Sequence, residues 1–248
     1  MNLDLVNQLS TPYEKWDYRQ LLENEKPNSV VEIVRGIKTS LLAKVNNPLE
    51  AAIYMATYIC DNGLEYHIEE SLRNSIEFNN NIRNMPLNPP DSIISYKYEF
   101  PLDSYLDLHT DIFNLNLCQP KGQYLFHGGH WKRFNKSITT TRPISTSYCP
   151  QVALRNGEWM GKSYDFGYCD LWVIKINDDR IRSYVYSIES GELSNEKEVL
   201  LMAGISLNLI RIHKIPVRHK AYKSNHKSGL NILAREIDYF VLEIEATI

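Results

Sequence analysis

The sequence changes character near Pro120, and this change constrains the fold more than any other feature. Before it, apolar residues recur mainly at helical spacing, whereas after it short aromatic-rich runs alternate with turn residues. A chain that separates helical from strand-forming segments in this way is typical of the α+β class. We therefore predict a mainly helical N-terminal region, residues 1–119, followed by a mostly antiparallel β region, residues 120–248.

The clearest helix signal in the first region lies at Asn47-Pro48. Asparagine caps helix N-termini well, and proline is favoured at the first helical position. The apolar run 49–60 continues this helix, and Asn62-Gly63 ends it. Apolar residues at helical spacing predict two further helices, over 65–83 and 102–115. The proline-rich segment 85–91 breaks regular structure and predicts a loop between them.

The second region contains runs rich in Tyr, Val and Ile, which favour strands. Few long helical segments separate them, so an antiparallel sheet or sandwich is expected. The predicted strands are Gln123–Phe126, Asp170–Ile176, Arg182–Tyr186, Glu198–Met202, Leu207–His213 and Tyr239–Ala246.

Composition excludes several other classes of protein. Hydrophobic residues make up 43% and charged residues 23% of the 248 residues, which is incompatible with wholesale disorder. No apolar run approaches the roughly 18 residues needed to span a bilayer. The N-terminus lacks the basic and apolar parts of a cleaved signal peptide. The four cysteines form no CxxC pair, so we expect a reducing, cytoplasmic site of action. Because no apolar run is long enough to span a bilayer, we expect no membrane partner.

The net charge of −3 conceals a basic segment: residues 199–235 contain no acidic side chain. Seven lysines and arginines and three histidines lie within it. Such a segment is either the solvated face of a hairpin or a surface that binds anions, including dinucleotide phosphates or nucleic acid.

Three short segments carry residues suited to chemistry. The first, Tyr124–Trp131, ends a predicted strand in His127, Gly128 and Gly129, where backbone amides can approach a ligand closely. The second, Thr139–Tyr148, places Ser145 and Ser147 on one face of a strand. Alone, each pattern is more typical of an ordinary turn or exposed strand.

The third segment contains Glu196 and Glu198, which project to the same side if the chain is extended. Two carboxylates so close repel each other, so at least one needs hydrogen-bond donors or its pKa will rise. An apolar run, Val199–Met202, follows directly. A solvated start of a strand would look the same.

Taken in order, the three segments resemble the mono-ADP-ribosyltransferase superfamily, which includes many bacterial and phage toxins. The matching motifs are Leu125-Phe-His-Gly-Gly129, Ile144-Ser-Thr-Ser147 and Glu196-Lys-Glu-Val-Leu-Leu201, and the third is the most specific. The resemblance covers residues 120–248 and implies an ADP-ribosyltransferase-like antiparallel β-sandwich core. Members with Ser-Thr-Ser and Glu-x-Glu usually carry arginine where this chain has His127. Histidine followed by glycine is typical of another branch of the superfamily.

The resemblance implies cleavage of the nicotinamide–ribose bond of NAD+, with NAD+ as a substrate. It implies that Glu198 stabilises the ribosyl cation, that Ser145 orients Glu198, and that Glu196 steers or deprotonates the acceptor. His127 would hold a ribose or phosphate, and Gly128 the nicotinamide amide.

Other candidate NAD+-binding residues are Thr146, Ser147, Tyr148 and Arg142, the last for the pyrophosphate. Tyr148, like Tyr164 and Tyr168, is a candidate stacking platform for nicotinamide, although packing in the core or on the surface is the commoner role of a single tyrosine. His127 and His130 form an HxxH without a third ligand, so no metal is expected. Cys149 has no activating neighbour in the sequence, and we expect an inert thiol there.

The resemblance implies a macromolecular acceptor. This acceptor is either a protein side chain, such as that of arginine, or a nucleic acid, RNA or DNA. A toxin or effector role follows from the resemblance, with an antitoxin or immunity protein as a possible partner. Two alternatives stay open: an NAD glycohydrolase, which transfers to water, and a non-catalytic binding domain of the same fold.

Overall fold

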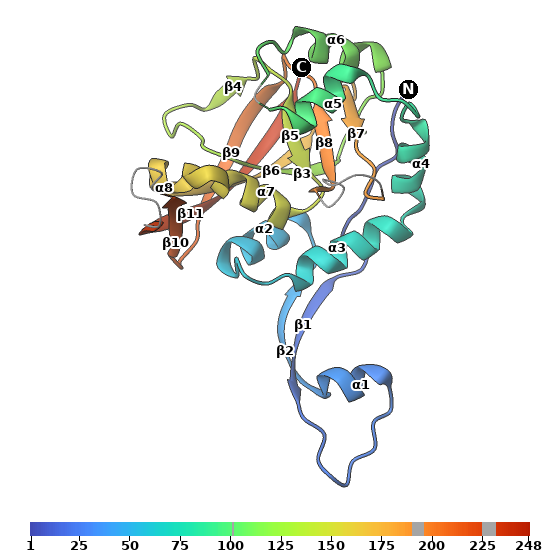
Figure 1. Ribbon diagram of the computed structural model, residues 1–248, viewed down its shortest axis with the longest axis vertical. Coiled ribbons are helices and arrows are strands. Elements are labelled where there is room, and N and C mark those ends of the chain that lie inside the picture. Colours follow the sequence, from blue (N-terminus) through green and yellow to red (C-terminus); the bar gives the residue numbers. More distant parts are fainter. Residues whose placement is uncertain (101, 190–195, 225–231) are drawn as a thin grey trace.

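The structure, a computed structural model, describes residues 1–100, 102–189, 196–224 and 232–248 (Figure 1). The helices are α1 Val30–Arg35, α2 Pro48–Thr57, α3 Gly63–Asn74, α4 Ile76–Asn84, α5 Asp91–Tyr98, α6 Leu106–Leu115, α7 Pro150–Glu158, the 3-10 helix η1 Trp159–Gly161 and α8 Lys162–Phe166. The strands are β1 Tyr13–Arg19, β2 Ile37–Val45, β3 Tyr124–Gly129, β4 Ser137–Thr139, β5 Ile144–Ser147, β6 Tyr168–Ile176, β7 Ser183–Val185, β8 Glu198–Leu201, β9 Ser206–Lys214, β10 His219–Ser224 and β11 Ile232–Thr247.

The first 100 residues are not only helical, which corrects the prediction. β1 and β2 pair antiparallel, from Tyr13↔Val45 to Arg19↔Ile37, before the first long helix begins. Together with α1 they form the β1–β2 arm, residues 13–45, which extends away from the rest of the molecule (Figure 1). Most side chains of β2 are exposed, so the strand lacks the apolar alternation that would have revealed it.

The predicted start of α2 is confirmed. The Asn47 side chain accepts a hydrogen bond from the Glu50 amide at 3.0 Å, and Pro48 is the first helical residue. The Glu50 carboxylate in turn accepts from the Asn46 amide at 2.8 Å, so the helix N-terminus is capped from both directions.

The helix predicted over 65–83 is in fact two helices, α3 and α4, which meet at Ser75. Ser75 has an extended backbone, and its hydroxyl accepts from the Phe78 amide at 3.1 Å. A serine that caps a new helix ends the previous one, because the cap residue cannot itself be helical. α6 confirms the helix predicted within 102–115, whereas α5, directly after the proline-rich break, was not predicted.

All six predicted strand runs contain a strand, and they belong to one mixed, mostly antiparallel sheet. Its order is β4-β9-β11-β6-β3-β5-β8-β7, with β10 paired to β11. Among the described strand pairs, β11 with β6 is the parallel one. The α+β class is thereby confirmed.

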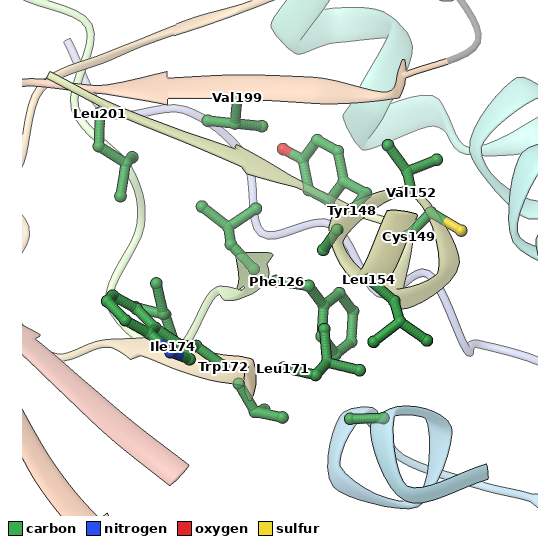
Figure 2. Close-up of a cluster of buried hydrophobic side chains, with 14 of the residues drawn as sticks. Phe126, Tyr148, Cys149, Val152, Leu154, Leu171, Trp172, Ile174, Val199 and Leu201 are labelled. Atoms are coloured by element: carbon green, nitrogen blue, oxygen red, sulfur yellow. The ribbon is translucent and has the colours of Figure 1, made fainter. Parts of the chain in front are cut away.

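In place of the expected two-sheet sandwich, the structure has one continuous sheet in which two neighbouring strands, β3 and β5, are paired only briefly. β3 and β5 share a single residue pair, Phe126↔Ser147, so β5, β8 and β7 are joined to the other strands by a short pairing. Figure 2 shows side chains from both parts pointing into one cluster: Phe126 and Ile174 from one, Val199 and Leu201 from the other. All four side chains are fully buried.

The hydrophobic core runs through both halves of the chain. One cluster contains Met55 and Leu64 from the N-terminal helices together with Ile174 and Val241 from the sheet. α2 contacts α7, β6 and β11 directly. The division into two domains at residue 120 stays a prediction.

Candidate active site

A cavity of about 690 Å³ opens where β3, β5 and β8 meet α5, α7 and α8. Its lining includes residues from all three motif segments, among them His127, Ser145 and Glu198. The segments are far apart in the sequence, and strand pairing brings them together: β5 hydrogen-bonds to β3 on one side and to β8 on the other.

Ser145 and Glu198 form the centre of the site. Ser147 lies opposite Glu198 across the β5–β8 pair, so Ser145, two residues away, faces the same side of the sheet. The Ser145 hydroxyl donates to a Glu198 carboxylate oxygen at 2.5 Å. Glu198 is 5% exposed. The predicted orienting contact between these two residues is therefore present.

The hydroxyls of Thr146 and Ser147 donate to backbone carbonyls next to Glu198. The Thr146 hydroxyl donates to the Val199 carbonyl at 2.6 Å, and the Ser147 hydroxyl donates to the Glu196 carbonyl at 2.7 Å. Both residues are 3% exposed. Their side chains hold the strand that carries Glu198, and because both residues also line the cavity, their predicted contact with NAD+ stays a prediction.

Lys97, near the C-terminal end of α5, was not predicted as a site residue. Its ammonium donates to Glu198 at 3.1 Å and to Glu196 at 3.3 Å, and lies 4.2 Å from the centroid of the Tyr186 ring. Glu196 and Glu198 thus do project to the same side. The lysine lies about 100 residues before the motif, in a segment without any motif of its own.

The pKa of Glu198 is raised above its ordinary value, mainly because burial penalises the charged carboxylate. The charge of Lys97 and the hydrogen bond from Ser145 act in the opposite direction and favour the ionised form. The site therefore holds a carboxylate whose charge depends on these two donors.

Lys197, between the two glutamates, points away from them. Its side chain is fully buried and forms ion pairs with Glu65 at 3.3 Å and Glu69 at 3.0 Å, both on α3. Its backbone has a φ of +50°, which non-glycine residues rarely adopt. The N-terminal helices thereby fix the conformation of the residue between the two glutamates.

His127 contributes a neutral ring to the cavity wall. Its Nδ1 lies 2.7 Å from the Ser145 carbonyl, which can only accept, so Nδ1 carries the proton and Nε2 is an acceptor without a hydrogen-bond donor among the described residues. Burial lowers the pKa of His127 to about 4, which keeps the ring neutral at pH 7. The ring lies 4.7 Å from that of Trp172.

Gly128 is required by packing inside the protein. A Cβ atom at this position would lie 1.8 Å from the Ala153 carbonyl oxygen of α7. The glycine therefore lets α7 approach β3 closely. This packing is sufficient to explain why position 128 is a glycine, and no bound ligand is needed to explain it. Gly128 still lines the cavity, and its predicted contact with nicotinamide stays a prediction.

Arg142 and Lys162 form a cationic part of the cavity wall. Arg142 donates to the Tyr105 hydroxyl at 3.2 Å, and its guanidinium lies 5.5 Å from the Phe100 ring centroid. Burial, and then the charge of Arg142, lower the pKa of Lys162. Within the part of the chain that the structure describes, neither cation pairs with a carboxylate. Lys162 was not predicted, because α8 carries no recognisable motif.

Tyr148 is not among the residues that line the cavity, and its predicted contact with nicotinamide stays a prediction. The residue is fully buried, and its ring packs edge-on against Phe78 with centroids 5.7 Å apart. Figure 2 shows it within the hydrophobic cluster beside Val199. Tyr164 and Tyr168 pack near Arg235 and Arg133, at 5.3 and 4.6 Å from the guanidinium carbons.

No three His, Cys, Asp or Glu residues among those described are arranged to hold a metal ion. Cys149 is fully buried, and burial raises the pKa of its thiol to about 11, in keeping with the inert thiol that was predicted. None of the helices in the described ranges is long and apolar enough to cross a membrane.

The basic segment 199–235 lies beside acidic side chains from other strands and from α8. Its ion pairs are Lys214–Asp238, Arg218–Asp238, Arg211–Glu243, His213–Glu243 and Lys223–Asp165. Much of its charge is therefore balanced within the protein, which favours the solvated hairpin over an anion-binding face. His226 and Lys227, which belong to the same prediction, lie outside the described residues.

Comparison with solved structures finds similarity to ADP-ribosylating toxins. The enzymatic component C2-I of the Clostridium botulinum C2 toxin is 10% identical with a TM-score of 0.41, over 68% of this chain and 46% of that one. BECa of C. perfringens, solved with NADH, is 14% identical with a TM-score of 0.42, over 73% and 48%. Vis toxin of Vibrio splendidus is 15% identical with a TM-score of 0.33, over 81% and 85%.

The chain thus spans about half the length of the two clostridial proteins. No protein-family model and no curated protein sequence matches it. The function proposed below is argued from the residues of the site.

Proposed function

We propose that this chain is an NAD+-dependent mono-ADP-ribosyltransferase, which cleaves the nicotinamide–ribose bond of NAD+ and transfers ADP-ribose to a macromolecular acceptor. One observation carries the proposal: a buried carboxylate, Glu198, oriented by Ser145 at 2.5 Å, shares a cavity with two cations, Arg142 and Lys162. The site thus offers a negative charge for a developing cation and positive charges for a pyrophosphate.

Glu198 supplies the negative charge. Breaking a glycosidic bond passes through an oxocarbenium-like state, which a fixed carboxylate stabilises most strongly in a site of low dielectric. Because Ser145 and Lys97 already hold Glu198, the carboxylate needs little reorganisation as the ribosyl cation develops. Glu196, which is about one third exposed, is placed to accept a proton from the incoming nucleophile.

The cationic part of the wall fits the diphosphate. Arg142 and Lys162 have no carboxylate partner among the described residues, so an anion between them would relieve their mutual repulsion. His127, with Nε2 unprotonated, would accept a hydrogen bond from a ribose hydroxyl rather than donate one to a phosphate.

The acceptor is proposed to be a protein side chain, RNA or DNA, and the biological role that of a toxin or effector acting in a cytoplasm. An antitoxin or immunity protein would then be a natural partner. The four cysteines are free, which fits a reducing compartment. An NAD glycohydrolase is a second candidate, favoured by Lys97, whose ammonium already contacts the glutamate that would face the acceptor.

Substitution of Glu198 by glutamine tests the proposal. It removes the charge and keeps the shape, so we expect nicotinamide release from NAD+ to fall by roughly 100- to 1,000-fold. Glu236→Gln, at an exposed glutamate, serves as the matched control and should leave the rate unchanged. A non-catalytic binding domain would release no nicotinamide even as the wild-type protein, and thermal unfolding would show that the variants are folded.

A further inference from the structure

The lysine that faces both glutamates is built into the site. The Lys97 side chain is 7% exposed, and the side chain of Glu198, one of its two partners, is 6% exposed. Its ammonium lies over the Tyr186 ring, and the Tyr186 hydroxyl donates to the Ile93 carbonyl of α5 at 3.0 Å. The ring under the ammonium is thus attached to the helix that carries the lysine.

Lys97 determines which charges can approach Glu196. A cationic nucleophile such as a guanidinium would have to bind that carboxylate beside an ammonium already 3.3 Å from it. Two like charges about 4 Å apart in a partly buried site disfavour binding by a factor on the order of 100 or more. An uncharged nucleophile meets no such repulsion. It can still pass its proton to Oε1 of Glu196, because Lys97 contacts the other carboxylate oxygen, Oε2.

We infer that Lys97 restricts this site to uncharged acceptors, of the hydroxyl class with water included, and excludes guanidinium acceptors. This inference rests on the proposed function. In the step, the nucleophile's oxygen bonds to C1 of the ribose while the bond from C1 to the nicotinamide nitrogen breaks. The bonding electrons neutralise the positive charge of the leaving nicotinamide, and the nucleophile's proton passes to Glu196 and then to water.

Two small acceptors test the restriction in the wild-type protein. With NAD+ and either methanol, a neutral alcohol, or agmatine, a guanidino compound, mass spectrometry would quantify each ADP-ribosyl product beside total nicotinamide release. We expect hydrolysis and the methanol adduct, with agmatine adduct at least tenfold lower than methanol adduct at equal acceptor concentration. Agmatine adduct equal to or above the methanol adduct would overturn the inference while leaving the proposed function intact.

Substitutions at Lys97 then test its role. Lys97→Met removes the charge and should raise the ratio of agmatine adduct to nicotinamide release at least tenfold. Lys97→Arg is the matched control: it keeps the charge and should retain the wild-type ratio. An unchanged ratio in a folded Lys97→Met protein contradicts the inference, and Lys97→Gln replaces it if that protein does not fold. Absence of nicotinamide release from the wild-type protein under every condition would overturn the proposed function, and the inference with it.

Discussion

The two parts of the cavity differ in how their charges are balanced. Glu198 is buried and already bound by Ser145 and Lys97, whereas Arg142 and Lys162 have no carboxylate partner in the described chain. The first part is preorganised before any ligand binds, and the second has cations available for a ligand anion. If the proposed function is correct, the carboxylate part would govern the chemical step, and the cationic part would govern the binding of NAD+.

After Glu198→Gln, the largest effect we expect is a loss of stability when Lys197, the buried residue between the two glutamates of the site, is replaced. Lys197→Met would leave Glu65 and Glu69 facing each other without their shared cation, and should lower the free energy of unfolding by about 2 kcal/mol. Urea denaturation measures this change. Arg73→Met removes an exposed partner of the same Glu69 and should cost less than about 0.5 kcal/mol. Equal losses would show that burial of Lys197 is not important.

The next prediction separates the chemical step, measured by kcat, from the binding of NAD+, measured by KM. Lys162→Met removes one of the two cations that line the cavity without a carboxylate partner among the described residues, so KM for NAD+ should rise about tenfold while kcat changes less than threefold. Lys132→Met, at an exposed lysine outside the cavity, is the control and should behave as wild type. Steady-state nicotinamide release gives both constants. A fall in kcat with unchanged KM would assign Lys162 to the chemical step and contradict its role in binding.

The smallest effect is a shift in pH dependence. Burial raises the pKa of Glu198, and activity requires the ionised form, so the rate should fall as the pH decreases through that value. The Ser145 hydroxyl favours the carboxylate, and Ser145→Ala should therefore move the acidic limb about half a unit to higher pH. Rate–pH profiles measure this shift, with the exposed Ser137→Ala as control. A limb that moves to lower pH would contradict the assignment.

Much of the fold and the centre of the site could be predicted from local patterns. Strand-forming runs such as β6 show in the sequence as stretches of Val, Ile and aromatic residues, and the strand period of two places Ser145 on the same face as Ser147. Applied one residue further, that rule also places Tyr148 with Thr146 on the opposite face. Glu196 precedes β8, and Lys197 between the two glutamates has a φ of +50°, so strand alternation does not explain why Glu196 and Glu198 meet.

Other features depended on contacts between distant segments. Lys97 and Lys162 lie on short helices without motifs, and only the folded chain brings them to the cavity. Gly128 looked like a ligand-binding glycine, yet its closest neighbour is the backbone of α7. The β1–β2 arm was missed because its strands are mostly exposed, so burial imposed no apolar alternation on them.

A crystal structure of the Glu198→Gln protein with NAD+ would test the central claim most directly, because the slow variant should keep the substrate intact. We predict a ribose next to the nicotinamide within hydrogen-bond distance of residue 198, and the pyrophosphate between Arg142 and Lys162. NAD+ bound on another surface, or with its phosphates away from both cations, would contradict the account.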